Sequence, residues 1–478
     1  MNKKPIYITT TLPYVNAKPH VGFAMEVIRA DVLARYHRLQ GREVFFNTGT
    51  DEHGMKIHQK AAEEGKNTQQ FLDDLVVHFK SLEDKLNLSY DNFIRTTDPD
   101  HKAAAQVFWK TCADKGYIYK KKYKGLYCIG CEMYVTEKDL VDGKCKHHPK
   151  QTPEEIEEEN YFFKYSDFSQ DLLKLFKKKK NFVVPQWRLK EIRNFVEGGL
   201  EDFSISRLKN KMPWGVPVPG DDEHVMYVWF DALVNYISTL GWPEDSDNFK
   251  KFWKKGEKIQ YCGKDNLQHQ SARWQSMLLA AGVSTSDRVV VNGFITSDGQ
   301  KMSKSMGNVI DPLEVVEEYG TDAIRYYVLR ELHPFEDSSF TMEKFKEAYN
   351  ANLANGLGNA VSRVMKMAED YLDSPIEQPK EEKFPKEYVK AFEEYNMQKA
   401  TEVVWKKISE IDSKIQETKP FKLVKEDKEA AKKIITELVS QLYTVARLLQ
   451  PFLPETSDII QKTIIENKKP EPLFLRKD

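Results

Sequence analysis

The chain has 478 residues, and its 72 basic and 73 acidic side chains give a net charge of −1. Charged residues make up 30% and hydrophobic residues 40%, which excludes a disordered chain and a uniformly basic coat for nucleic acid. The length suggests about three domains. No apolar run approaches the ~20 residues that span a bilayer, and the few, clustered cysteines suit a reducing compartment. We therefore expect a cytoplasmic protein without a membrane partner.

The first predicted elements form a βαβ unit. Residues 6–11 are expected to be a buried strand, and a turn held by Pro13 and Pro19 follows. Apolar side chains then recur at helical spacing over residues 25–39, and residues 43–47 return to a strand. This pattern predicts a parallel sheet that binds its ligand at the carboxyl edge of the strands. The chain has no GxGxxG or Walker A sequence, so another device must hold a nucleotide.

Residues near 115–225 interrupt this pattern. They contain most of the cysteines, an acidic run at 154–159 and a basic run at 177–180, and both runs are predicted to be solvated faces. The α/β pattern then resumes, and its predicted elements are a strand at 259–262, a helix at 266–281, a strand at 288–292 and a tight turn at 298–299. From about residue 342 the pattern is helical. The expected fold class is α/β: a parallel sheet split by an insertion and followed by a helical bundle.

Two short strings far apart in the chain suit phosphate chemistry. His20 can donate to a phosphate at a helix N-terminus, and Gly22 lets the backbone approach closely. Lys301 and Lys304, in the string KMSKS, supply mobile positive charges. Each string alone reads as an ordinary turn or surface loop. Together on an α/β frame, they favour a site that holds phosphates from both sides.

Two short pairs of metal-binding side chains predict a zinc knuckle in the insertion. Thiolates and an imidazole on tight turns suit tetrahedral Zn²⁺, and four protein ligands leave no open position, so one structural zinc ion per chain is expected. The predicted ligands are Cys128, Cys131, Cys145 and His148, with His147 as the alternative fourth ligand.

The phosphate strings resemble the HIGH and KMSKS signatures of the class I aminoacyl-tRNA synthetases. The strings LPY (12–14), TDEHG (50–54), YVWFDA (227–232) and GKD (263–265) are similar to those of the methionyl-tRNA synthetase family, so the resemblance covers most of the chain. It implies a Rossmann-like sheet and a methionine–tRNA ligase. Such an enzyme makes methionyl-adenylate from methionine and ATP with Mg²⁺, and transfers the acyl group to the terminal adenosine of tRNA(Met). The alternatives are a class I synthetase for leucine, valine or cysteine, and a paralogue that binds tRNA without catalysis.

The resemblance also implies roles for individual residues. Asp51 would receive the substrate ammonium group, and Asp265 would lie beside the adenosine. His20 and Lys304 would contact ATP. Aromatic walls favour a polarizable thioether such as the methionine side chain. The residues that the resemblance implies for this side-chain pocket are Leu12, Tyr14, Trp229, Ala232, Tyr236, Gln270 and Trp274. The chain departs from the family at Phe23 and Gln270, where histidines are usual.

The helical end resembles the anticodon-binding domain of the family. Asn355, Asn359 and Arg363 are spaced for one helix face, and Phe421 follows Pro420 where the family stacks an anticodon base. The implied anticodon residues are Asn359, Arg363 and Phe421. The chain ends soon after this region, so no appended domain and a monomer are expected. The implied domains are residues 1–115 and 226–310 (catalytic halves), 116–225 (insertion), 311–345 (KMSKS and stem-contact region) and 346–478 (anticodon domain).

Overall fold

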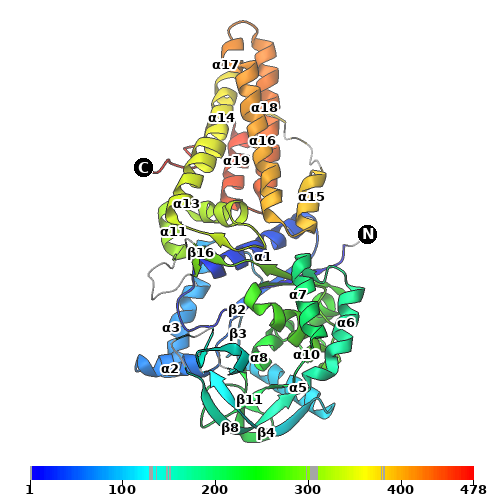
Figure 1. Ribbon diagram of the computed structural model, residues 1–478. Coiled ribbons are helices and arrows are strands. Elements are labelled where there is room, and N and C mark those ends of the chain that lie inside the picture. The colour runs from blue at the N-terminus through cyan, green and yellow to red at the C-terminus, as the bar shows by residue number, and fades with distance from the viewer. Residues whose placement is uncertain are drawn as a thin grey trace. The chain divides into compact units, whose positions relative to one another are not determined.

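The computed structural model describes residues 3–128, 133–135, 137–146, 149, 152–297, 299–301, 310–377, 379 and 383–478. The chain divides into two compact units, each built from separate stretches of sequence (Figure 1). The first unit contains Met1–Pro19, Gly41–Ser81 and Tyr90–Val291. The second unit contains His20–Gln40, Leu82–Ser89 and Asn292–Asp478.

A six-stranded sheet with strand order β3-β2-β1-β14-β15-β9 organises the first unit. Strand β1 lies between β2 and β14 and is parallel to both, with Ile8 opposite Phe46 and Ile259. The pairs β2–β3 and β15–β9 are also parallel, which confirms the α/β class expected from the sequence. The strands are β1 (Ile6–Thr9), β2 (Val44–Thr50), β3 (Asn92–Arg95), β9 (Val183–Val184), β14 (Glu257–Gly263) and β15 (Arg288–Asn292).

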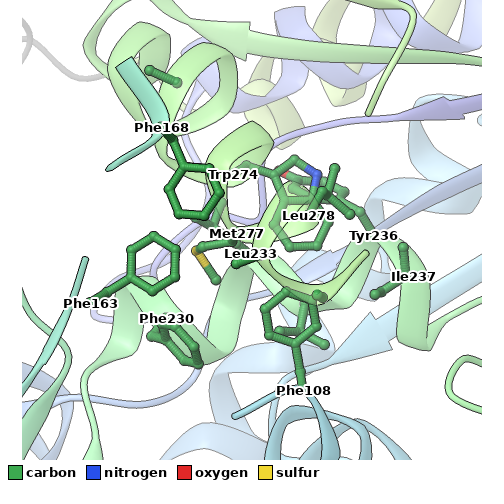
Figure 2. Packing of buried hydrophobic residues seen from close by; sticks show 14 of the residues in the cluster. Phe108, Phe163, Phe168, Phe230, Leu233, Tyr236, Ile237, Trp274, Met277 and Leu278 are labelled. Carbon is green, nitrogen blue, oxygen red and sulfur yellow. The ribbon is translucent and has the colours of Figure 1, made fainter. Parts of the chain in front are cut away.

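Aromatic side chains from helices that flank this sheet form the core of the first unit. Figure 2 shows Phe108, Phe230 and Trp274 among its members, and the rings of Phe108 and Trp274 lie 5.9 Å apart. Burial of such rings removes a large apolar area from water, which fixes the helices firmly. The helices of this unit are α2 (Met55–Glu63), α3 (Thr68–Lys80), α5 (Pro99–Asp114), α6 (Ser169–Lys178), α7 (Gln186–Glu197), α8 (Val228–Asp231), α9 (Asn235–Ser238) and α10 (Trp274–Ala281).

The region before α10 is helical as predicted, but it is not one regular α-helix. A 3₁₀ turn, η5 (Lys264–Asn266), and a π-helix, η6 (His269–Arg273), precede α10. π-Turns re-aim side chains and occur often at functional sites. A π-turn contains one residue more than an α-helical turn. Hydrophobic periodicity alone could not reveal it, because the apolar spacing of the segment fits an α-helix or a π-helix.

The insertion contains a second sheet, in which the acidic run forms strand β8 (Glu154–Phe163) and pairs antiparallel with the lysine-rich strand β4 (Ile118–Cys128). Glu159 lies opposite Lys122, an arrangement that stabilises paired strands. Glu157 and Glu159 are exposed, as predicted, but Glu158 is buried and binds Lys211 at 2.6 Å. The expectation of a solvated face is therefore wrong for Glu158, because alternate residues of a strand face opposite sides. The remaining strands are β5 (Met133–Val135), β6 (Leu140–Val141), β7 (Lys144–Cys145), β10 (Phe203–Ser204), β11 (Ser206–Leu208), β12 (Pro217–Val218) and β13 (Asp221–Met226).

Two buried arginines hold the second unit together. Arg29, on α1 (Val21–Leu39), donates to Asn292 Oδ1 and to four backbone carbonyl groups of residues 328–334. Arg325 donates to Asp31 Oδ2 at 2.8 Å and to the carbonyl groups of Phe452 and Leu86. Burial opposes ionisation of Asp31, but Arg325, Arg35 and Ser89 outweigh it and lower the pKa of that carboxyl. These arginines tie α1 to the C-terminal helices of the same unit.

The rest of the second unit is mainly helical, as predicted. A small sheet of β16 (Ile295–Ser297), β17 (Gln300–Lys301) and β18 (Ser338–Ser339) precedes the bundle. The helices are α4 (Leu82–Lys85), α11 (Pro312–Tyr319), α12 (Thr321–Tyr326), α13 (Met342–Ala348), α14 (Asn359–Tyr371), α15 (Lys386–Glu393), α16 (Met397–Thr418), α17 (Pro420–Leu423), α18 (Lys428–Leu449) and α19 (Pro454–Glu466). Among the described residues, no helix combines the length and apolar character needed to cross a membrane.

Candidate active site

Tyr14 and Asp51 meet at the carboxyl ends of two neighbouring strands. They form an isolated parallel bridge, in which Asp51 N–H donates to Pro13 O at 2.9 Å and Val15 N–H donates to Asp51 O at 3.0 Å. The Asp51 side chain is only 6% exposed. Adjacent parallel strands bring their carboxyl ends to one edge, so the topology places this carboxylate where the sequence predicted a ligand.

Glu52 anchors the loop that carries Asp51. Its buried carboxylate accepts hydrogen bonds from Thr50 Oγ1 at 2.5 Å, from Arg95 Nε at 2.8 Å and from Thr97 Oγ1. Its own N–H donates to Thr96 Oγ1 at 2.9 Å. A buried carboxylate is tolerated only when it is paired and hydrogen-bonded, and these partners meet that need. The loop beside Asp51 is therefore fixed to β3 and the residues after it.

An aromatic wall lies next to this loop. Trp229, on α8, and Tyr14 pack against a small buried cluster that contains Tyr227, Val228 and Ala232. The indole of Trp229 stacks on the imidazole of His269, with 3.8 Å between ring centroids and 8° between the planes. Burial, and then the nearby Arg273 guanidinium, lower the pKa of His269 well below its usual value, so the stacked ring is neutral. The structure thus brings Tyr14, Trp229 and Ala232 together.

The four other predicted pocket residues are deeply buried. Gln270 Nε2 donates to Tyr236 OH at 2.5 Å, and the rings of Tyr236 and Trp274 lie 5.8 Å apart. Figure 2 shows both rings inside the hydrophobic core of the first unit. Trp274 is completely buried, and Leu12 is 8% exposed. Tyr236 thus contacts both Gln270 and Trp274, and the role of the four residues as pocket walls stays a prediction.

His20 and Gly22 form a local structure at the start of α1. His20 is the N-cap of the helix, and its Nδ1 accepts from Gly22 N–H at 3.0 Å. A Cβ at position 22 would lie 2.8 Å from His20 Cε1 and 2.9 Å from Nδ1, so glycine is required for the ring to take this place. With Nδ1 as acceptor, a neutral imidazole carries its proton on Nε2. The exposed ring can therefore donate to an anion while it caps the helix.

The remaining ATP residues are only partly described. Asp265 lies exposed in η5, directly after β14 ends, and accepts from Asn266 Nδ2 at 3.3 Å. Lys301 ends β17, where its backbone pairs with Thr296. The side chain of Lys301 and the whole of Lys304 lie outside the described residues, and so does Asp298 of the predicted turn. Gly299 has a φ of +77°, as that turn requires.

Two of the four predicted zinc ligands are described. Cys128 ends β4, Cys145 ends β7, and both belong to one small buried cluster with Val135. Cys131, His147 and His148 lie outside the described residues, and the described part of the chain alone contains no group of three or more metal-binding side chains. Two buried thiols from two short hairpins in one cluster fit half of a tetrahedral site.

The predicted anticodon residues lie on three elements of the second unit. Asn355 is exposed in a π-helix, η9 (Tyr349–Gly358), and Asn359 is exposed at the start of α14. Arg363 is half-buried and binds Asp412 on α16 at 3.2 Å. Phe421 is 42% exposed on α17, which joins α16 to α18 at one end of the bundle (Figure 1). An exposed phenylalanine at a helix junction is available for stacking, whereas Arg363 already has an ionic partner.

Sequence reasoning gave no role to His53 and Asp231, although both lie in strings that it quoted. They are 2% and 0% exposed in side-chain terms, and 3.3 Å separates His53 Nδ1 from Asp231 Oδ2. Burial, and then the nearby Lys102, lower the pKa of His53 to about 3. Burial raises the pKa of Asp231 well above its usual value. Only the fold could show this pair, because its members come from distant segments.

Comparisons with known proteins agree with this geometry. The chain matches the family model for "tRNA synthetases class I (M)" over residues 6–152 and 137–365. It is 40% identical over 475 residues to the methionine–tRNA ligase of Clostridium acetobutylicum, which covers 96% of this chain and 73% of that protein. Against the ligase of Thermotoga maritima, it is 38% identical over 480 residues, covering 97% and 76%. The fold is similar to that of Mycobacterium tuberculosis methionyl-tRNA synthetase in complex with methionyl-adenylate, with a TM-score of 0.90, 34% identity and 100% coverage of both chains.

Proposed function

The chain belongs to the methionyl-tRNA synthetases of class I, and from that premise we propose how its residues divide the work of a methionine–tRNA ligase. The ligase activity, with ATP, methionine and tRNA as substrates, follows from the family. The alternatives of a leucine, valine or cysteine enzyme, or of a non-catalytic paralogue, are set aside with it. What remains to be proposed is the role of each residue.

We propose that Asp51 binds the ammonium group of methionine and that Tyr14, Trp229 and Ala232 hold its side chain. The observation that carries this proposal is the bridge between Tyr14 and Asp51, which places a buried carboxylate beside an aromatic wall. Sulfur–aromatic contacts favour a thioether by about 0.3–1.5 kcal/mol each. Leu12, Tyr236, Gln270 and Trp274 complete the proposed pocket.

The proposed ATP site consists of His20, Asp265, Lys301 and Lys304. Adenylation needs no covalent catalyst, because the carboxylate of methionine is already a nucleophile. Its oxygen attacks the α-phosphorus of ATP, the bond to the β-phosphate oxygen breaks, and pyrophosphate leaves with Mg²⁺. The protein positions these groups and stabilises the charge that builds on phosphate. In this proposal the Nε2–H of His20 and the positive charges of the two lysines stabilise that negative charge, and Asp265 lies beside the adenosine.

Methionine-dependent exchange of labelled pyrophosphate into ATP tests this assignment directly. We expect methionine to give the largest kcat/KM of the twenty amino acids, because the proposed pocket combines a carboxylate for the ammonium group with polarizable walls. A larger kcat/KM for leucine, valine or cysteine would contradict the proposed pocket. Omission of Mg²⁺ should abolish the exchange.

We also propose one structural zinc ion, bound by Cys128, Cys131, Cys145 and either His147 or His148. Replacement of Cys128 by serine should lose the metal and loosen the insertion, because a closed site contributes folding energy. Elemental analysis of protein purified without chelator should find about one zinc per chain in the wild type. Cys112→Ser is the control. Cys112 is buried in α5 among apolar residues and is not a proposed ligand, so this variant protein should keep its zinc. Loss of zinc from His147→Ala but not from His148→Ala would identify His147 as the fourth ligand.

The helical bundle is proposed to read the methionine anticodon through Asn359, Arg363 and Phe421. Replacement of Phe421 by alanine should raise the KM for tRNA about 10- to 100-fold, because base–aromatic stacking is worth about 1–3 kcal/mol per base. Pyrophosphate exchange without tRNA should not change. Trp187→Ala removes another exposed aromatic ring, in α7 of the first unit, and is the control. An unchanged KM for tRNA would return Phe421 to a purely structural role. The monomeric state and the cytoplasmic location stay predictions from the sequence.

A further inference from the structure

A buried pair, His53 and Asp231, connects the two halves of the proposed methionine site. His53 follows Asp51 by two residues, on the loop that carries the ammonium-binding carboxylate. Asp231 lies on α8 between Trp229 and Ala232, on the segment that forms the side-chain pocket. The atoms His53 Nδ1 and Asp231 Oδ2 are 3.3 Å apart.

The surroundings of the pair favour its uncharged forms. Burial is the largest cause that lowers the pKa of His53 to about 3 and raises that of Asp231. The charged and titratable neighbours are Lys102, Glu52 and His101. A buried, ionised carboxylate costs several kcal/mol unless strong partners surround it. Within the described residues, neither oxygen of Asp231 nor Nδ1 of His53 has a hydrogen-bond partner that meets the usual geometry, and Nδ1 and Oδ2 approach each other to 3.3 Å. A neutral carboxyl group that donates its proton to Nδ1 satisfies both members at the smallest cost.

Other contacts already anchor the Asp51 loop and α8 to the rest of the first unit. The His53–Asp231 pair therefore influences the separation between the loop and α8. Glu52 fixes the Asp51 loop to Arg95, at the end of β3, and to Thr97, which follows β3. Trp214 Nε1 donates to Glu52 O at 2.7 Å and holds the loop from the other side. On α8 the described contacts of Trp229 are to His269 and to its apolar neighbours. The close approach of the Asp231 carboxyl to the His53 imidazole is thus a buried polar contact between this loop and α8.

We propose that His53 and Asp231 form an uncharged clamp that sets the separation between the Asp51 carboxylate and the Trp229 pocket, and thereby the length of the amino-acid side chain that the site accepts. Both are positioning residues, because they act through Asp51 and Trp229. The proposal rests on the proposed role of Asp51. A methylene in an apolar pocket changes selectivity by about 10- to 200-fold, and a misplacement of about 1 Å can cost about 10²-fold, so a fixed separation has a measurable effect on selectivity.

The test compares Asp231→Asn with Asp231→Leu in pyrophosphate exchange. An asparagine amide can donate to Nδ1 as a carboxylic acid does, so this variant should keep the wild-type KM for methionine within about threefold. Leucine has a similar size but no donor, and should raise that KM about 10- to 100-fold, with the KM for ATP unchanged. It should also lower the preference for methionine over ethionine, which is one methylene longer, and over S-methylcysteine, which is one shorter. His53→Gln is the reciprocal variant and should lower the same preference.

His224→Gln is the matched control. His224 is equally buried and lies 3.1 Å from Asp221, but this histidine–aspartate pair is in the insertion. Its replacement should lower thermal stability without a change in side-chain selectivity. If His224→Gln changes side-chain selectivity as much as Asp231→Leu does, the change reflects a general loss of stability, and the proposed clamp is overturned. The same assay includes Asp51→Asn. An unchanged KM in Asp51→Asn refutes the proposed ammonium site. A raised KM in Asp51→Asn together with unchanged selectivity in Asp231→Leu and His53→Gln refutes the clamp alone. If Asp231→Leu does not fold, the side-chain selectivity of His53→Gln alone tests the clamp, and unchanged selectivity in that variant refutes it.

Discussion

Replacement of Lys304 by alanine is expected to lower the kcat of methionine-dependent pyrophosphate exchange about 10²–10³-fold. In the proposed function this lysine neutralises charge that builds on the phosphates as the α-phosphorus is attacked. Removal of one such group from a closed site typically costs that factor. His20→Ala should give a loss of similar size, because in the proposed function His20 Nε2 donates to the same phosphates. The fold should survive both changes, and for His20 the exposed position of the side chain is the reason.

Lys60→Ala is a suitable control for the lysine. Lys60 is exposed on α2 and pairs with Glu63 at 2.8 Å, and such surface pairs contribute little. Its replacement should leave kcat unchanged. Circular dichroism and thermal melting establish that each variant is folded. A folded Lys304→Ala enzyme with wild-type kcat would remove Lys304 from the proposed mechanism, and the charge would then have to come from Lys301.

Replacement of Asp51 by asparagine is expected to raise the KM for methionine by roughly 30-fold or more. Loss of one partner of a buried, hydrogen-bonded charge pair costs about 2–5 kcal/mol, and each 1.4 kcal/mol is a factor of ten. Asparagine keeps the size of the side chain, and the bridge to Tyr14 uses only backbone atoms. The loop should therefore keep its conformation, and the KM for ATP should stay near its wild-type value.

A methionine analogue without the amino group sharpens this test. The wild-type enzyme should bind the analogue far more weakly than methionine, and Asp51→Asn should bind both about equally. Asp245→Asn is the control, because Asp245 is an exposed carboxylate paired with Lys254. If the analogue and methionine still differ by the wild-type factor in Asp51→Asn, the ammonium group is held elsewhere.

The sequence alone determined the elements that depend on local patterns. The apolar run at 288–292 coincides with β15, and the helical spacing at 25–39 falls within α1. Both follow from periodicity, which neighbouring residues set without help from the rest of the chain. The βαβ pattern also predicted a ligand at the carboxyl edge of the parallel strands, and the resemblance gave Tyr14 and Asp51 their roles. The meeting of these two residues at that edge was shown by the structure.

The tertiary structure alone decided what depends on distant segments. The acidic run was predicted to be a solvated face, but pairing with β4 turns Glu158 inward to Lys211. The predicted helix at 266–281 contains a π-turn that stacks His269 on Trp229. His53 and Asp231 are ordinary polar residues in the sequence, and only burial and mutual contact make them an uncharged pair. Long-range packing determines which side chains lose water and which groups face them, and no local pattern contains that information.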